Sequence, residues 1–231
     1  AKAARSWGKS TAHLRAQILY YLGENLSIRT DEFAGRISDM TGHNLEEAKE
    51  EVQLSIERLF TYAAWADKYD GATHGAPIRA VTLAMNEPVG TIGMICPDEY
   101  PLLGLISLIA PALAMGNTCV VVPSEPYPLA ATDLYQVLET SDLPAGVVNL
   151  VTARHEEVIE SLSGHMDLDA VWYFGSSGLS STVEKLSSTN LKRTWVNHGK
   201  HRNWTNIKQG EGQEFLRQST EVKNIWIPYG E

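Results

Sequence analysis

The first third of the chain, from residue 10 to residue 68, spaces its apolar residues as helices do. Four of them recur every fourth residue and predict one apolar stripe along a helix: Leu14, Ile18, Leu22 and Leu26. A second helix is expected over 31–40, and a third begins at Asn44. Glu47 stands three residues after Asn44, which is the spacing of a capping box. The pattern therefore predicts a set of packed N-terminal helices.

Acidic residues gather in the first two turns of that third helix, at Glu46, Glu47, Glu50 and Glu51. A helix N-terminus attracts negative charge, because the backbone dipole is positive there. We interpret this cluster as a solvated helix start, in preference to a metal site.

From residue 79 to residue 197 the pattern changes to short apolar runs that alternate with helical segments. Strands are expected at 90–96, 118–122, 147–151, 170–174 and 193–196, with helices at 101–115, 129–140, 155–163 and 177–188. This alternation predicts an α/β fold, a Rossmann-like five-stranded parallel sheet with helices on both faces. Ligands of such sheets lie beyond the carboxyl ends of the strands, here 97–101, 122–125, 152, 175–178 and 197–200.

Two further strands stand outside this alternation. Residues 79–85 predict one strand of a hairpin, and residues 219–227 predict a final strand that is apolar on both faces at 225–227. A lone terminal strand is unstable, so it pairs with the hairpin, with another subunit or with another domain. The polar stretch 200–212 is interpreted as a linker. The expected organisation is N-terminal helices (1–76), an oligomerisation hairpin and strand (77–88 with 217–231), a Rossmann-like domain (89–200) and a linker (201–216).

Charge and cysteine content narrow the classes of partner. The net charge is −9, from 19 basic and 28 acidic residues, and such a field repels phosphate backbones and anionic lipids. We therefore expect neither a nucleic-acid nor a membrane partner. Cys96 and Cys119 lie in apolar surroundings and suit reduced thiols of a cytoplasmic protein. The sequence starts at Ala1 without an initiator methionine, so we expect that it begins inside a longer protein or was trimmed.

Three further features of the sequence are considered as functional sites, and each has a structural interpretation that is favoured. His198 and His201 are three residues apart, but neither a cysteine nor a carboxylate lies beside them, so no metal site is expected. Cys96 ends a strand at the ligand-binding edge, where a reactive thiol is conceivable. Its charged sequence neighbours Asp98 and Glu99 would raise its pKa, and a buried structural cysteine is the favoured interpretation. Trp172, Tyr173 and Phe174 are interpreted as strand core rather than as a platform for a cofactor.

Five motifs that follow one another along the chain resemble the aldehyde dehydrogenase superfamily. They are EPVGTIG at 87–93, APALAMGNT at 110–118, PSE at 123–125, LPAGVVN at 143–149 and FGS at 174–176. The stretch TEVK at 220–223 resembles the superfamily's C-terminal oligomerisation strand. Residues 96–103, 172–176 and 226–231 are most similar to the second, C-terminal dehydrogenase-like half of family 16 aldehyde dehydrogenases.

The resemblance also implies that the family's chemistry is missing here. In the family, a cysteine nucleophile lies in a separate domain after the Rossmann-like half, whereas this sequence passes from Val196 directly to its last strand, with no cysteine after Cys119. Glu99 takes the place of the asparagine that stabilises the oxyanion, and an ionised carboxylate donates no hydrogen bond. Asn197 takes the place of the general base, and an amide has no useful basicity. We therefore expect no catalytic residue, with Glu99 and Asn197 as degenerate positions.

Cofactor binding is expected to be reduced in the same way. Val122 replaces the lysine that meets the adenosine ribose, and Ser180 replaces the second glycine of the family's turn. A remnant of the dinucleotide site is left, and it consists of Ser124, Glu125, Gly175 and Ser176. We expect no cofactor, and NAD or NADP at this remnant is the alternative.

Two functions follow from this resemblance. The favoured one is a non-catalytic module that assembles a larger family 16 aldehyde dehydrogenase. Its partner would be the full dehydrogenase domain of the same parent chain, a second identical subunit in a homodimer, or both, joined through the C-terminal strand. The alternative is a residual NAD(P)-binding module of an active aldehyde dehydrogenase, an oxidoreductase. The residues leave both open.

Overall fold

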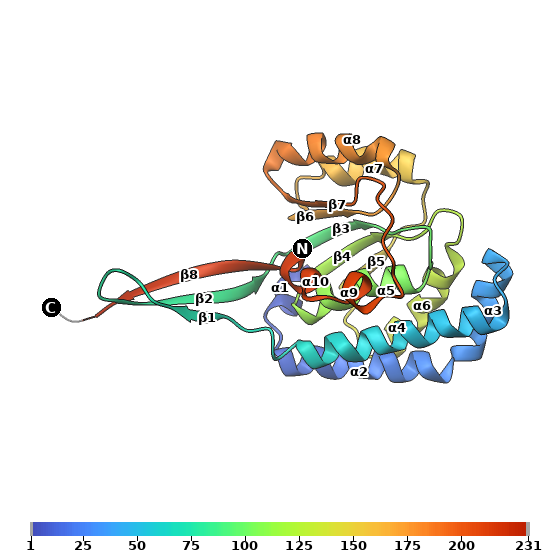
Figure 1. Ribbon diagram of the computed structural model, residues 1–231, viewed down its shortest axis with the longest axis horizontal. Helices are drawn as coiled ribbons and strands as arrows, with labels where there is room; N and C mark the ends of the chain where they lie inside the picture. Colours follow the sequence, from blue (N-terminus) through green and yellow to red (C-terminus); the bar gives the residue numbers. More distant parts are fainter. Residues whose placement is uncertain (1, 230–231) are drawn as a thin grey trace.

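The computed structural model describes residues 2–229, and its N-terminal part is helical (Figure 1). Four helices follow one another: α1 (Lys2–Gly8), α2 (Ala12–Ile28), α3 (Thr30–Thr41) and α4 (Leu45–Trp65). The capping box of α4 is confirmed, because Glu47 N donates to Asn44 Oδ1 (3.0 Å) and Asn44 N donates to Glu47 Oε2 (3.1 Å). The predicted stripe of α2 is wrong at its first member, since Leu14 is 45% exposed and the buried face begins at Ala16.

The five-stranded parallel sheet is confirmed, with the strand order β5-β4-β3-β6-β7. Its strands are β3 (Thr91–Ile95), β4 (Thr118–Val122), β5 (Val148–Leu150), β6 (Ala170–Tyr173) and β7 (Arg193–Val196). One face packs on α5 (Leu103–Ala114), α6 (Leu129–Thr140) and the N-terminal helices; the other packs on α7 (His155–Gly164) and α8 (Ser177–Ser187), which a short turn η1 (Ser188–Asn190) follows (Figure 1). Alternate side chains enter the two cores: Met94 and Trp172 on one side, Ile95 and Val171 on the other.

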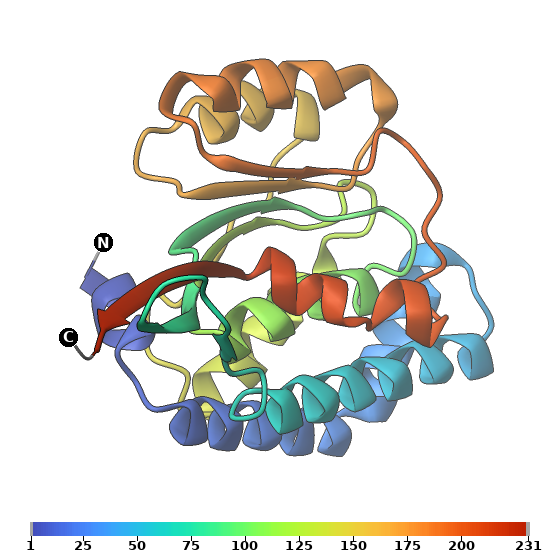
Figure 2. The ribbon, with the colours of Figure 1, turned by 60° about the vertical axis from the view of Figure 1, so that its left-hand side comes forward.

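A second, antiparallel sheet extends away from this body as a ribbon (Figures 1 and 2). It has the order β1-β2-β8 and consists of β1 (Ala72–His74), β2 (Ala80–Pro88) and β8 (Thr220–Pro228). Along its whole length β8 pairs with β2, from Ala80 opposite Pro228 to Pro88 opposite Thr220. Of the three partners considered for the last strand, the hairpin is the one observed. The outer edge of β8 has no strand partner within residues 2–229.

The polar segment 200–212, interpreted from its composition as a linker, is folded and packed. It holds α9 (Ile207–Gly210), and α10 (Gln213–Gln218) follows it, lying across α5 (Figure 2). Trp204, Phe215 and Leu216 are buried in the main core. Arg58 of α4 holds this segment by two contacts. Its Nη2 donates to Trp204 O (2.7 Å), and its Nε lies 3.2 Å from Glu211 Oε2.

Asn117 joins the body to the ribbon. Its side chain is fully buried in the turn between α5 and β4. Its Oδ1 accepts from Gly90 N (2.9 Å) at the start of β3, and its Nδ2 donates to Ala112 O (3.0 Å) and to Ser219 O (2.8 Å) before β8. One amide thus satisfies backbone groups of three segments that are distant in sequence.

The interpretation of the acidic cluster as a solvated helix start is wrong for Glu51. Its side chain is buried, and its Oε1 accepts from Leu102 N (2.8 Å) and Leu103 N (3.1 Å). Glu51 therefore caps the N-terminus of α5, where four backbone N–H groups have no partner inside the helix. Burial outweighs these two donors and raises the pKa of Glu51 above its ordinary value.

We expect Glu51→Gln to be at least as stable as the parent at neutral pH. An amide oxygen can still accept from both N–H groups, while the buried charge is removed. The unfolded carboxyl ionises near pH 4.3 and the folded one at higher pH, so the parent loses free energy of unfolding relative to the variant as the pH rises through this window. Urea unfolding at pH 4 and pH 7, with the exposed Glu50→Gln as control, measures this. The same stability difference at both pH values would contradict it.

None of the helices within residues 2–229 has both the length and the apolar composition that crossing a membrane requires.

Candidate functional site

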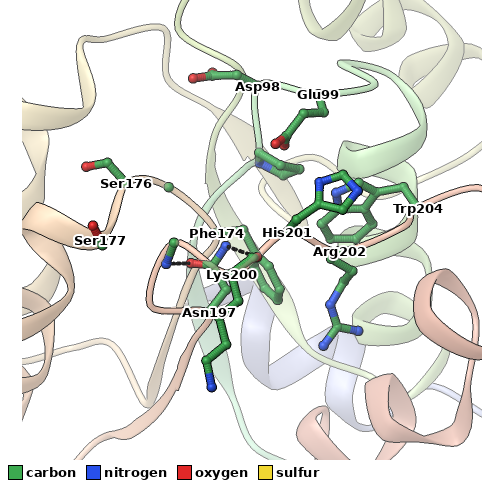
Figure 3. A pocket seen from close by; sticks show the side chains of 13 residues that line it. Asp98, Glu99, Phe174, Ser176, Ser177, Asn197, Lys200, His201, Arg202 and Trp204 are labelled. Atoms are coloured by element: carbon green, nitrogen blue, oxygen red, sulfur yellow. Dashed lines mark hydrogen bonds between the residues drawn. The ribbon is translucent and has the colours of Figure 1, made fainter.

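The loops after β3, β6 and β7 meet at the carboxyl edge of the parallel sheet and enclose a cavity of about 320 Å³ (Figure 3). We call it the strand-end cavity. Four of the six residues expected from the sequence lie here, which are Glu99, Gly175, Ser176 and Asn197. The other lining residues are Pro97, Asp98, Phe174, Ser177, Gly199, Lys200, His201, Arg202 and Trp204. This edge is where parallel sheets bind ligands.

Ser124 and Glu125 follow β4 at the same edge, but they do not line the strand-end cavity. The buried Ser124 hydroxyl donates to Asp98 Oδ1 (3.0 Å), and the Glu125 N–H donates to the same oxygen (3.1 Å). The Glu125 carboxylate accepts from His155 N (2.8 Å) at the start of α7. Both residues thus tie neighbouring loops together. Asp98 accepts both of the bonds from the loop after β4, a role that no sequence motif indicated.

The Tyr173 side chain leaves no space for a side chain at position 175, where the chain has a glycine. A Cβ at this position would stand 2.6 Å from the Tyr173 hydroxyl oxygen, which donates to Ser176 O (2.9 Å). Ser176 precedes α8, and its hydroxyl makes no capping bond to that helix. Ser180 is buried in the first turn of α8, where its hydroxyl contacts Ser176 O (3.4 Å). The turn before α8 is therefore shaped by contacts within the protein.

The loop after β7 lies against the first residue of α8. Gly199 has a left-handed backbone (φ 67°), and a Cβ there would stand 2.8 Å from Ser177 Cβ and 2.9 Å from Ser177 N. Asn197 builds this loop, since its Oδ1 accepts from Gly199 N (3.1 Å) and its Nδ2 donates to Lys200 O (3.4 Å), as the dashed lines of Figure 3 show. The amide of Asn197 is thus used to hold a turn.

Neither cysteine thiol is accessible at the strand-end cavity. Cys96 and Cys119 are both unpaired and fully buried, and burial raises the pKa of each thiol far above its ordinary value. In the part of the chain that the structure describes, no three His, Cys, Asp or Glu side chains gather as metal ligands. His198 instead pairs with Glu184 of α8 (Nε2 to Oε1, 3.3 Å).

An aromatic cluster that sequence reasoning missed contributes two residues, Phe174 and Trp204, to the lining of the strand-end cavity. Phe174 packs edge to face with both Trp195 and Trp204, and Phe215 of α10 adds a fourth ring. The Arg202 guanidinium lies 5.2–5.9 Å from the centroids of all four rings. Its two terminal nitrogens reach Glu214 Oε2 at 3.2 Å. The only signal in the sequence was the density of tryptophans and phenylalanines after β6.

Known proteins match both the sequence and the fold. The family described as aldehyde dehydrogenase family matches residues 1–205. A hydroxyisobutyraldehyde dehydrogenase from Mycolicibacterium austroafricanum is 34% identical over 83% of this chain and 38% of its own length. An aldehyde dehydrogenase from Emericella nidulans is 32% identical over 97% of this chain and 44% of its own length.

Solved structures give the same result. A betaine aldehyde dehydrogenase from Staphylococcus aureus in complex with NAD⁺ superposes with a TM-score of 0.79 at 29% identity, over 84% of this chain and 41% of the other. A putative aldehyde dehydrogenase from Burkholderia cenocepacia gives 0.81 at 27% identity, over 84% and 40%. The chain thus spans about two fifths of the length of these relatives. This chain belongs to the aldehyde dehydrogenase family, because the family model matches most of its residues, the five motifs occur in order, and its fold superposes on those of the solved relatives.

Proposed function

We propose that this chain is a non-catalytic aldehyde dehydrogenase-like module, similar to the second half of family 16 enzymes. Its ribbon joins it to a second subunit of the same protein, including any complete dehydrogenase domain which that subunit carries. The observation that carries the proposal is the path of the chain between β7 and β8. It makes two short packed helices and enters the ribbon, where the family resemblance places a domain with a cysteine nucleophile.

The residues around the strand-end cavity support the same proposal. Glu99 stands where the resemblance expects an oxyanion donor, and Asn197 stands where it expects a general base. Asn197 is moreover engaged in its own loop. A carboxylate and an amide in these places supply neither function.

The ribbon supports the assembly role. Val222 and Trp226 lie four residues apart on β8 and therefore on one face of the ribbon, 58% and 55% exposed. Ile227, Tyr229 and Met85 add further exposed apolar surface. Exposed apolar side chains beside an open strand edge mark a surface for association. A second subunit would cover both the exposed apolar side chains and the open edge of β8.

Sedimentation velocity of the full-length protein tests the assembly role. We expect an oligomer for the parent and a smaller species for the double variant Val222→Glu, Trp226→Glu. More than half of each side chain is exposed in the single chain, so we expect the variant to fold. Ile28→Glu, at an apolar residue 82% exposed on α2, is the control and should leave the mass unchanged. A monomeric parent, or a double variant of parental mass, would contradict the proposal.

Calorimetric titration with NAD and NADP tests the loss of cofactor binding. We expect dissociation constants above about 100 µM, which corresponds to less than about 5 kcal/mol of binding free energy. Val122 is buried where the resemblance expects a lysine, and Ser124 and Glu125 already have partners. Tighter binding would favour the alternative, a dinucleotide-binding module of an active aldehyde dehydrogenase.

A further inference from the structure

A second cavity, of about 400 Å³, opens on the other side of the loop after β7. We call it the lysine cavity. It lies between that loop and the segment of α9 and α10, and the residues that matter for its chemistry are His198, Lys200, Arg202, Lys208, Gln209 and Glu214. Its volume falls in the range of sites for small molecules. The assembly role proposed above makes no use of it.

Positive charge is concentrated here, although the whole chain carries a charge of −9. Glu214 is paired with Arg202 at 3.2 Å, and Glu184, which lies 3.3 Å from His198, does not line this cavity. Lys200 and Lys208 have exposed side chains, and neither makes an ion pair or a side-chain hydrogen bond with residues 2–229. Two ammonium groups around this cavity are therefore left without a counter-charge.

Lys200 and Arg202 line both cavities, whereas Asp98 and Glu99 line only the strand-end cavity of the two. Figure 3 shows Lys200 and Arg202 leaving the loop on the same side, away from Asp98 and Glu99, which face the strand-end cavity. Gln209 adds an amide at the lysine cavity; its Oε1 accepts from Asn203 N (2.9 Å), and its Nε2 has no hydrogen-bond partner in residues 2–229. At Lys200, Lys208 and Gln209 the groups still able to bond are thus donors.

We propose that the lysine cavity binds a small oxyanion with more than one negative charge, carried on phosphate or carboxylate groups. Lys200 and Lys208 would supply the charge, and the Gln209 amide would supply a neutral donor. Ammonium groups bind phosphate as point charges without a fixed orientation, and hydrogen bonds to ionised oxygens are stronger than neutral ones. The Arg202–Glu214 pair forms a fixed wall, because the aromatic cluster holds Arg202 in place.

Calorimetric titration with inorganic pyrophosphate and with citrate tests the site, with sodium chloride at matched ionic strength as the reference. We expect saturable binding of at least one probe, with a dissociation constant below about 1 mM. Affinity should fall as salt rises. A preference for pyrophosphate would identify a phosphate-bearing ligand, and a preference for citrate a carboxylate.

Variants locate the binding. Lys200→Ala and Lys208→Ala should each weaken it by about threefold to tenfold, and the double variant more than either. Lys9→Ala, at an exposed lysine before α2, is the matched control and should bind as the parent does. Both substituted lysines are exposed, so unchanged thermal unfolding is expected to accompany the loss. Absence of saturable binding, or binding that survives in the double variant, would overturn the proposal.

Discussion

Replacing Arg58 with alanine is expected to lower the free energy of unfolding by about 3–5 kcal/mol. The Arg58 side chain is almost fully buried between α4 and the segment that carries α9 and α10. Its loss leaves Glu211 and the carbonyl oxygen of Trp204 without their partner. The effect is large because groups that stay buried lose hydration without any compensation.

Urea unfolding of Arg58→Ala beside Arg36→Ala measures the difference. Arg36 also pairs with a carboxylate, at 2.6 Å from Asp133, but its side chain is 42% exposed. A pair at the surface contributes about 0–1 kcal/mol. Equal losses for the two variants would show that the segment after β7 is not fixed by Arg58.

Asn117→Ala is expected to lower the free energy of unfolding by about 3 kcal/mol, because three hydrogen bonds to backbone groups are lost, two buried and one part-buried, at about 1 kcal/mol each. Two of these bonds hold the starts of β3 and β8, so the ribbon should also exchange its amide hydrogens faster relative to the body. Hydrogen exchange and urea unfolding measure the two effects.

Asn224→Ala is the matched control for Asn117. Asn224 lies on β8 with an exposed side chain that makes no hydrogen bond to residues 2–229. Its replacement should change the stability by less than about 0.5 kcal/mol. If Asn117→Ala were as mild as this control, the junction between body and ribbon would have to rest on other contacts.

The parallel sheet could be predicted from the sequence because each strand and helix there carries a strong local pattern. The expected bounds of β4, α6 and β7 agree with the observed ones. The segment after β7 has no such pattern. Its polar residues bond locally, as when Asn206 Oδ1 accepts from Lys208 N (2.9 Å), and its core residues Trp204 and Phe215 follow no helical or strand period. Packing of that kind depends on distant residues such as Arg58.

For the candidate site, too, the positions of the residues could be predicted from the sequence, but their bonding partners could not. Strand ends predicted from the pattern brought Glu99, Gly175, Ser176 and Asn197 to one edge. What each side chain does there depends on its partner, and a sequence motif does not name the partner. Glu51 illustrates this, because its charge suited a solvated helix start while its true partners, Leu102 N and Leu103 N, are distant along the chain.

The position of Trp226 has an optical consequence. The chain has six tryptophans, and Trp226 on β8 is the one with more than half of its surface in water, whereas Trp7, Trp172, Trp195 and Trp204 are buried. Its emission should lie at the longest wavelength of the six, and it should be the one most accessible to quenchers such as iodide. Any molecule that covers the ribbon would shift this emission to the blue, so the protein contains its own fluorescent reporter of contact.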